Sequence, residues 1–139
     1  MSGFFTTGVR NGLLNHLLGG PDRARAATLY LAGLTTAPAI DGSGFVEAAY
    51  ADYARVAKTN NDTNFPAAAN GQKTNGTQID FPEVGAGQVG TINIVGFGVF
   101  EQALGGTPIA YAPAAKAITA LDTLYVAAAT LAFELNNAA

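Results

Sequence analysis

Apolar residues fill both faces of one segment near the middle of the chain, residues 91–100, which read T-I-N-I-V-G-F-G-V-F and carry no charge. In a strand, alternate side chains point to opposite faces. One face would carry Ile92, Ile94 and Phe100, and the other Val95, Phe97 and Val99. Such a strand must be covered on both sides, so we expect it at the centre of a β-sandwich. Gly96 and Gly98 share a face, and because glycine weakens a strand, the pair predicts a bulge or close packing against the backbone.

Shorter segments with the same period lie on both sides of this strand, separated by clusters of Gly, Pro, Asn and Asp. We expect strands at 28–35, 53–58, 78–81, 108–112, 116–121, 123–127 and 130–135, with a weaker one at 45–50. Asp122 is expected to form the turn of a hairpin. Short strands at this spacing predict a mainly β fold, an antiparallel β-sandwich of jelly-roll or Ig-like type with seven to eight strands.

One short N-terminal helix is expected at residues 7–18, because apolar side chains recur there every three to four residues. The apolar stripe consists of Val9, Leu13, Leu14, Leu17 and Leu18. Thr6 or Thr7 can cap the start, and Gly19-Gly20-Pro21 ends the helix. A helix this short needs a docking surface. The stripe could dock on the sandwich or on a neighbouring subunit, and the first is the default expectation.

The whole chain, residues 1–139, is expected to form a single domain. An N-terminal arm and the helix would occupy 1–20, and the β-sandwich 28–135. Residues 59–76 form a polar insert rich in asparagine, which we interpret as a long loop. Loops of this length in compact domains are usually functional or mobile.

The charged fraction is 12%, about half of the value typical of soluble proteins. Charge depletion is typical of interface cores, so we infer that much of the surface is covered in an assembly. A neutral surface rich in Asn, Thr and Ala is the alternative. The net charge of −3 and the scattered Lys and Arg residues argue against a nucleic-acid partner. Neither a targeting segment nor a membrane span is expected.

The residues that usually carry chemistry are scarce. The chain has no cysteine and a single histidine, His16, so we expect no metal site and no Ser-His-Asp triad. Residues 85–90 match G-x-G-x-x-G, but a β pattern follows them, and no helix is available to hold a phosphate. Asp62 among asparagines could bind Ca²⁺, although these residues are also the commonest turn formers. We expect no catalytic or cofactor-binding residue and no enzyme.

Seven segments, in order, resemble a family of small bacteriophage virion proteins, often labelled as tail-fibre or decoration-type proteins. They are L-L-N-H-L-L-G at 13–19, Y-L-A-G-L-T-T-A-P at 30–38, Y-A-R-V-A at 53–57, N-F-P-A-A at 64–68, N-G-T-Q-I-D-F-P at 75–82, V-G-F-G-V-F at 95–100 and T-L-Y-V-A-A-A-T-L-A-F-E-L at 123–135. The resemblance implies a structural β protein with no catalytic residues.

The function expected from these observations is that of a capsid decoration or cement protein acting through subunit contacts. The alternatives are a tail, tail-fibre, collar or baseplate adaptor component and, more remotely, a small ligand-binding module. The expected partners are other virion proteins, either the major capsid protein or tail proteins, and further copies of the chain in a homo-oligomer. The expected location is the phage particle, assembled in the host cytoplasm. Candidate contact residues lie in the arm, the helix and the polar insert: Phe4, Phe5, Val9, Leu13, Leu14, Leu17, Asn60, Asn61, Asp62, Asn64 and Phe65.

Overall fold

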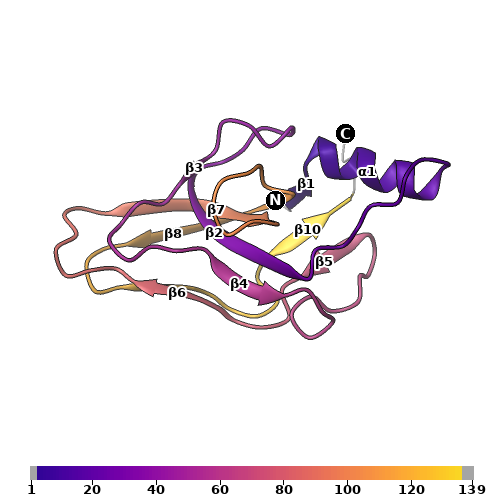
Figure 1. Ribbon diagram of the computed structural model, residues 1–139. Coiled ribbons are helices and arrows are strands. Elements are labelled where there is room, and N and C mark those ends of the chain that lie inside the picture. The colour runs from indigo at the N-terminus through magenta and orange to yellow at the C-terminus, as the bar shows by residue number, and fades with distance from the viewer. Residues whose placement is uncertain (1–2, 136–139) are drawn as a thin grey trace.

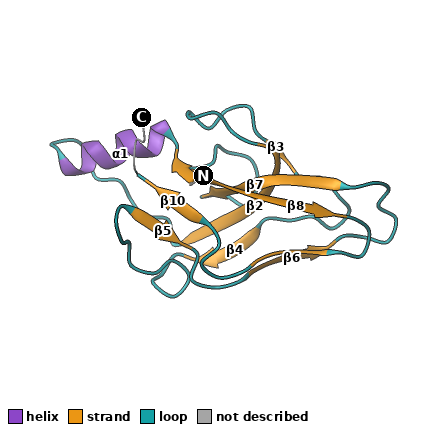
Figure 2. Cartoon of the chain, turned by 180° about the vertical axis from the view of Figure 1, so that it is seen from behind, coloured by secondary structure: helices purple, strands orange, loops and turns teal. Residues whose placement is uncertain are grey.

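The computed structural model describes residues 3–135, in which the chain forms ten strands and one helix (Figures 1 and 2). In chain order they are β1 (Gly3–Phe5), α1 (Thr7–Leu17), β2 (Thr28–Thr36), β3 (Val46–Glu47), β4 (Val56–Thr59), β5 (Gln72–Thr74), β6 (Ile79–Glu83), β7 (Ile92–Phe100), β8 (Ala110–Ile118), β9 (Thr123–Val126) and β10 (Ala132–Glu134). The expected class, a mainly β and sandwich-like fold with one short helix, is confirmed. The ten strands exceed the expected seven to eight because several are only two or three residues long.

Two sheets make up the fold. Eight strands form one sheet in the order β3-β2-β7-β8-β1-β10-β5, with β4 also paired to β2, and β6 pairs with β9 in a second sheet. The segment at 91–100 is the central strand β7, antiparallel to β2 on one side and β8 on the other. One pair, β1 with β10, is parallel, so the sheet is mixed rather than wholly antiparallel.

Both faces of β7 are covered, as its apolar residues predict. On one face Phe97 and Val99 belong to the main core, to which the small sheet contributes Phe81 and Leu124. On the other face Phe100 belongs to a second buried cluster with Ala32, Leu34 and Tyr111. Phe45, from the loop before β3, packs edge-on against Phe100 with ring centroids 5.4 Å apart. Loops therefore complete the side that the second sheet does not reach.

The expected alternation along β7 is wrong at one point, where a bulge in β8, between Pro113 and Lys116, interrupts the pairing of the two strands. The β7–β8 register shifts between Ile94 and Gly96, opposite Pro113, which cannot donate a ladder hydrogen bond. Ile94 and Phe97 consequently lie in the same core, while Val95 is 38% exposed. The Tyr111 hydroxyl donates to the Val95 carbonyl at 3.2 Å. A bulge and close packing, the two alternatives that the glycine pair predicted, are both present.

The C-terminal strands differ from expectation. The segments expected at 108–112 and 116–121 are parts of one long strand, β8, and no hairpin joins β8 to β9. Instead β9 pairs with β6 in the second sheet. Backbone hydrogen bonds between two loops direct β9 away from β8 and toward β6. Val84 N–H donates to the Asp122 carbonyl and Leu121 N–H to the Val84 carbonyl, each at 2.9 Å.

A buried arginine, Arg55, connects the segments that cover the face of β7 opposite the second sheet. The Arg55 side chain is 4% exposed and makes a two-pronged ion pair with Glu47, with both N–O distances 3.0 Å. Its Nη1 donates to the carbonyls of Gln102 and Gly105 at 2.8 and 2.9 Å, and its guanidinium lies 3.6 Å from the centre of the Phe100 ring. Tyr53 donates to the same carboxylate at 2.7 Å. Burial, with that bond, raises the pKa of Tyr53 far above its usual value.

Replacing Gly96 with alanine should lower the free energy of unfolding by about 2 kcal/mol, because overpacking a tight site costs that much. A Cβ there would meet the Tyr111 ring and the Ala112 carbonyl. Gly87→Ala is the matched control, since a Cβ at Gly87 has no neighbour within 4 Å. Urea unfolding measures both. Equal stabilities for the two variants would contradict the close packing described here.

Arg55→Lys should also lower the free energy of unfolding by about 2 kcal/mol, because lysine cannot reproduce the planar fork or the stacking on Phe100. Arg25→Lys, at an exposed arginine, should change it by less than about 0.5 kcal/mol. The same denaturation experiment compares them. A neutral Arg55→Lys would mean that Arg55 does not hold the 101–106 loop.

Candidate assembly surface

The N-terminal arm is part of the sheet. Residues 3–5 form β1, which inserts between β8 and β10. Gly3 permits this fit, since a Cβ there would lie 2.7 Å from the Ala132 carbonyl oxygen. Phe4 packs against Tyr111 and Phe5 against Phe133, with ring centroids 5.7 and 6.3 Å apart. Of the N-terminal arm expected within residues 1–20, residues 3–5 are therefore a strand of the sheet, while Met1 and Ser2 lie outside the described residues.

The helix α1 has the expected bounds within one residue. Thr6 is the N-cap residue, but its hydroxyl donates to the Pro108 carbonyl at 3.1 Å instead of capping the helix. At the other end Gly19 has a φ of +84°, and Gly20 N–H donates to the Asn15 carbonyl at 2.6 Å. This is the glycine-dependent Schellman ending, as the sequence indicates. The helix is thus pinned at its start and sharply terminated.

The expected docking of the leucine stripe onto the sandwich is wrong. No residue of α1 is buried, and Leu14, Leu17 and Leu18 are 55%, 73% and 79% exposed. The helix lies along one end of the sandwich, beside β1 and β10 (Figure 1). Only the start of the stripe, Val9 and Leu13, is half-buried, and these two side chains line a cavity. Most of the stripe has no partner within residues 3–135.

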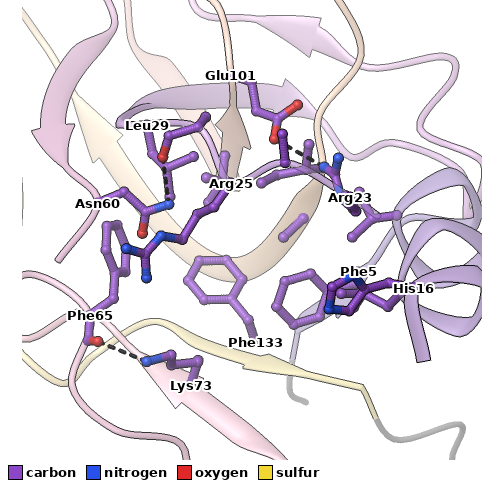
Figure 3. Close-up of a pocket in the computed structure, with 17 residues that line it drawn as sticks. Phe5, His16, Arg23, Arg25, Leu29, Asn60, Phe65, Lys73, Glu101 and Phe133 are labelled. Atoms are coloured by element: carbon purple, nitrogen blue, oxygen red, sulfur yellow. Dashed lines mark hydrogen bonds and ion pairs between the residues drawn. The ribbon is translucent and has the colours of Figure 1, made fainter. Parts of the chain in front are cut away.

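That cavity has a volume of about 320 Å³ and lies between α1, the 23–26 linker and the sheet (Figure 3). Its walls are mainly apolar and include Phe5, Val9, Leu13, Leu29, Phe65 and Phe133. The rings of Phe5 and Phe133 lie next to each other at its centre (Figure 3). A cavity of this kind suits an apolar occupant, since an apolar cavity of about 150 Å³ can already bind benzene.

The rim of the cavity is basic, although the chain as a whole is acidic. Arg23 pairs with Glu101 at 3.0 Å. Arg25 and Lys73 have no carboxylate partner within residues 3–135, and the Lys73 ammonium donates only to the carbonyls of Phe65 and Pro66, at 2.9 and 2.8 Å. Both cations lie on the Phe65 side of the cavity, whereas Arg23 lies toward α1 (Figure 3). The cavity therefore combines an apolar interior with positive charge on one side.

The polar insert is more ordered than a free loop. Asn60 donates to the Ala26 carbonyl and Asn64 to the Thr59 carbonyl, at 2.8 and 2.9 Å. The Asn61 carboxamide accepts from Asn64 N–H at 2.9 Å. These asparagines mainly stabilise the insert itself, and β5 lies within it. Asp62 is exposed.

One residue expected to be a surface contact, Phe65, is 8% exposed and belongs to the main core. It therefore contributes little to the outer surface, although its side chain lines the cavity. For the other ten residues a role in assembly stays a prediction. The sequence pattern gave no sign of Arg25, Lys73 and Phe133 as neighbours, because they come together only through the sheet topology.

The other candidate sites in the sequence are the glycine-rich segment at 85–90 and the scattered acidic residues. The G-x-G-x-x-G segment at 85–90 joins β6 to β7 directly. A strand follows these glycines, as the sequence pattern predicted, and not the helix that a phosphate-binding loop requires. Within residues 3–135 no three His, Asp or Glu side chains gather where they could hold a metal ion. No helix in the described part of the chain has the length and hydrophobicity to cross a bilayer.

The fold and this surface define a sandwich-like β protein with an exposed helix and an open apolar cavity at one end. A family model described as podophage GP4 fiber I protein gp80 matches residues 5–134. The chain belongs to this family of small phage virion structural proteins, which confirms the resemblance inferred from the sequence. A search of curated proteins found no match.

Replacing Phe5 with alanine should lower the free energy of unfolding by about 2 kcal/mol, because Phe5 is a half-buried part of an interior strand and packs on Phe133. The helical control, Leu17→Ala, should change it by less than about 0.5 kcal/mol, since Leu17 is 73% exposed. Thermal and urea unfolding test the pair. If the two variants were equally stable, β1 would not be an integral strand.

Proposed function

We propose that this chain is a structural subunit of a phage fibre, acting through contacts with other virion proteins. The observation that carries the proposal is the family match over residues 5–134, whose description names a fibre protein. Capsid decoration, the function expected from the sequence, rests on the charge-poor composition and the scarcity of residues that carry chemistry, and both suit either position. The family description therefore favours the fibre.

The proposed mechanism is burial of surface, without a catalytic step. A standard protein interface removes about 800 Å² from each partner. The chain exposes 7450 Å², so one such contact would cover roughly a tenth of its surface. The exposed leucines of α1 and the cavity beside them are the parts of the surface best suited to the centre of a contact, because interface cores are apolar and poor in charge.

The remaining parts of the proposal concern organisation. Residues 1–139 would act as one domain, and the partners would be further copies of the chain and other virion proteins. Among the candidate contact residues, Leu14 and Leu17 have the most exposed apolar side chains. The subunit would be assembled into particles in the host cytoplasm.

The test is the copy number of the chain per purified particle, measured against the major shell protein, together with gold labelling of intact particles. A fibre subunit should be present in about three to a few dozen copies, because tail structures are built on low-order rings, and the label should lie on the tail. Copies in the hundreds spread over the shell would favour capsid decoration. Absence from particles would overturn both.

A further inference from the structure

The loop between β8 and β9 presents an exposed leucine in an unusual backbone conformation. Leu121 has a φ of +67° and is 62% exposed. Positive φ is a genuine outlier for a bulky residue, and the surrounding structure must hold it in place. The Asp122 carboxylate accepts from Thr119 N–H at 2.6 Å and from the Thr119 hydroxyl at 3.1 Å, and Asp122 N–H donates to the Thr119 carbonyl. Leu121 is therefore a rigid apolar projection.

Two acidic residues and one lysine lie near this projection. The lysine, Lys116, lines the same surface hollow as Asp122, and its ammonium lies 5.0 Å from the centre of the Tyr125 ring. The loop after β6 is bonded to it through Val84 and carries Val89, which is 90% exposed. Glu83, at the end of β6, pairs with Thr123 directly after the projecting loop and is exposed. Asp122 uses only Oδ2 in the bonds to Thr119. The chain thus offers a fixed leucine with two carboxylates beside it.

The projection and the cavity lie at opposite ends of the molecule. In Figures 1 and 2 the loops that follow β6 and β8 are at one end, and α1 is at the other. One end therefore has an apolar projection with acidic neighbours. The other has an apolar cavity whose rim carries Arg25 and Lys73 without carboxylate partners in the described chain.

We propose that Leu121 of one copy enters the cavity beside α1 of a second copy, so that copies of this chain join head to tail. The charges at the two ends are opposite, which is the arrangement that fixes the register of an interface. The volume of about 320 Å³ accommodates the Leu121 side chain. The contact also gives the strained backbone at Leu121 a role, because a loop that is already held in its binding conformation loses little freedom on binding.

Because projection and cavity are different surfaces, the contact is heterologous: each copy has one of each, and the copies form a closed ring or an open filament. This inference rests on the proposed function, because the head-to-tail contact would be the one through which the subunits assemble in the virion. It names the partner as a second copy of this chain.

The first experiment measures mass by light scattering and sedimentation as the purified chain is concentrated. Leu121→Asn removes the apolar group but tolerates positive φ, so it should keep its melting temperature and weaken self-association at least about tenfold. Leu104→Asn removes another leucine, 88% exposed, that neither lines the cavity nor belongs to the β8–β9 loop, and this variant should self-associate like the wild type. Arg25→Glu reverses the charge on the rim and should weaken association as Leu121→Asn does.

Mixing gives the more specific test. The Leu121→Asn chain keeps an intact cavity, and the Arg25→Glu chain keeps an intact projection. Each alone should be monomeric, and an equimolar mixture should form a pair of two copies and nothing larger. A head-to-tail contact requires this result, whereas a symmetric contact, in which each copy uses the same surface, does not.

Three results would overturn the inference: a wild-type chain that is monomeric at about 1 mM, an Arg25→Glu chain that assembles like the wild type, or a mixture that forms no pair. Particle counts keep the two proposals distinct. A chain present in particles but monomeric in solution would refute the head-to-tail contact and leave the virion role standing, with a different virion protein in the cavity. A chain absent from particles would refute the virion role itself.

Discussion

The structure depends on one constraint, which is that a central strand without charge must be covered on both faces. On one side of β7 the second sheet supplies the cover, with Phe81 and Leu124 in the shared core. On the other side no sheet is present within the described chain, and Arg55 performs that task by lying over Phe100 and bonding the loop at 101–106. A guanidinium can cover apolar surface without leaving its charge unpaired when all its nitrogens donate hydrogen bonds and its plane lies against an aromatic ring. The buried Arg55 and its hydrogen bonds are thus a consequence of the apolar strand.

A bulge in β8 interrupts the pairing of that strand with β7. Pro113 in β8 has no N–H to donate, so the ladder must be interrupted where it meets β7, and Gly96 lies at that point. The absent side chain leaves space for Tyr111, whose hydroxyl donates to the carbonyl of Val95, opposite the bulge. Burial raises the pKa of the Tyr111 hydroxyl, in keeping with a neutral donor on a buried ring. A proline, a glycine and a tyrosine on two strands therefore act as one unit.

Local sequence pattern predicted the features that neighbouring residues decide. The alternation of β2, the two-sided burial of β7 and the glycine ending of α1 each depend on side-chain period or on a single backbone conformation, and each is present. The pattern failed where the decision is long-range. The partner of β9 depends on backbone bonds between Val84 and the loop at Leu121. The basic rim of the cavity depends on Arg25, in the linker before β2, and Lys73, in β5, which come together only in the folded protein. The period of α1 identified its apolar face but not what covers that face.

The positions of the unburied apolar residues argue for assembly more strongly than the low charge does. A neutral surface could be spread evenly over the molecule, and it would then indicate only solubility without charge. Here the most exposed apolar side chains are concentrated in loops and along α1, at Val89, Leu104, Leu17 and Leu18, while the central strands bury theirs. The free energy falls when an exposed apolar group leaves water. Such groups at the two ends of a rigid sandwich therefore favour contacts made end to end. The sandwich holds them apart, and the strained loop at Leu121 keeps one of them in a fixed position.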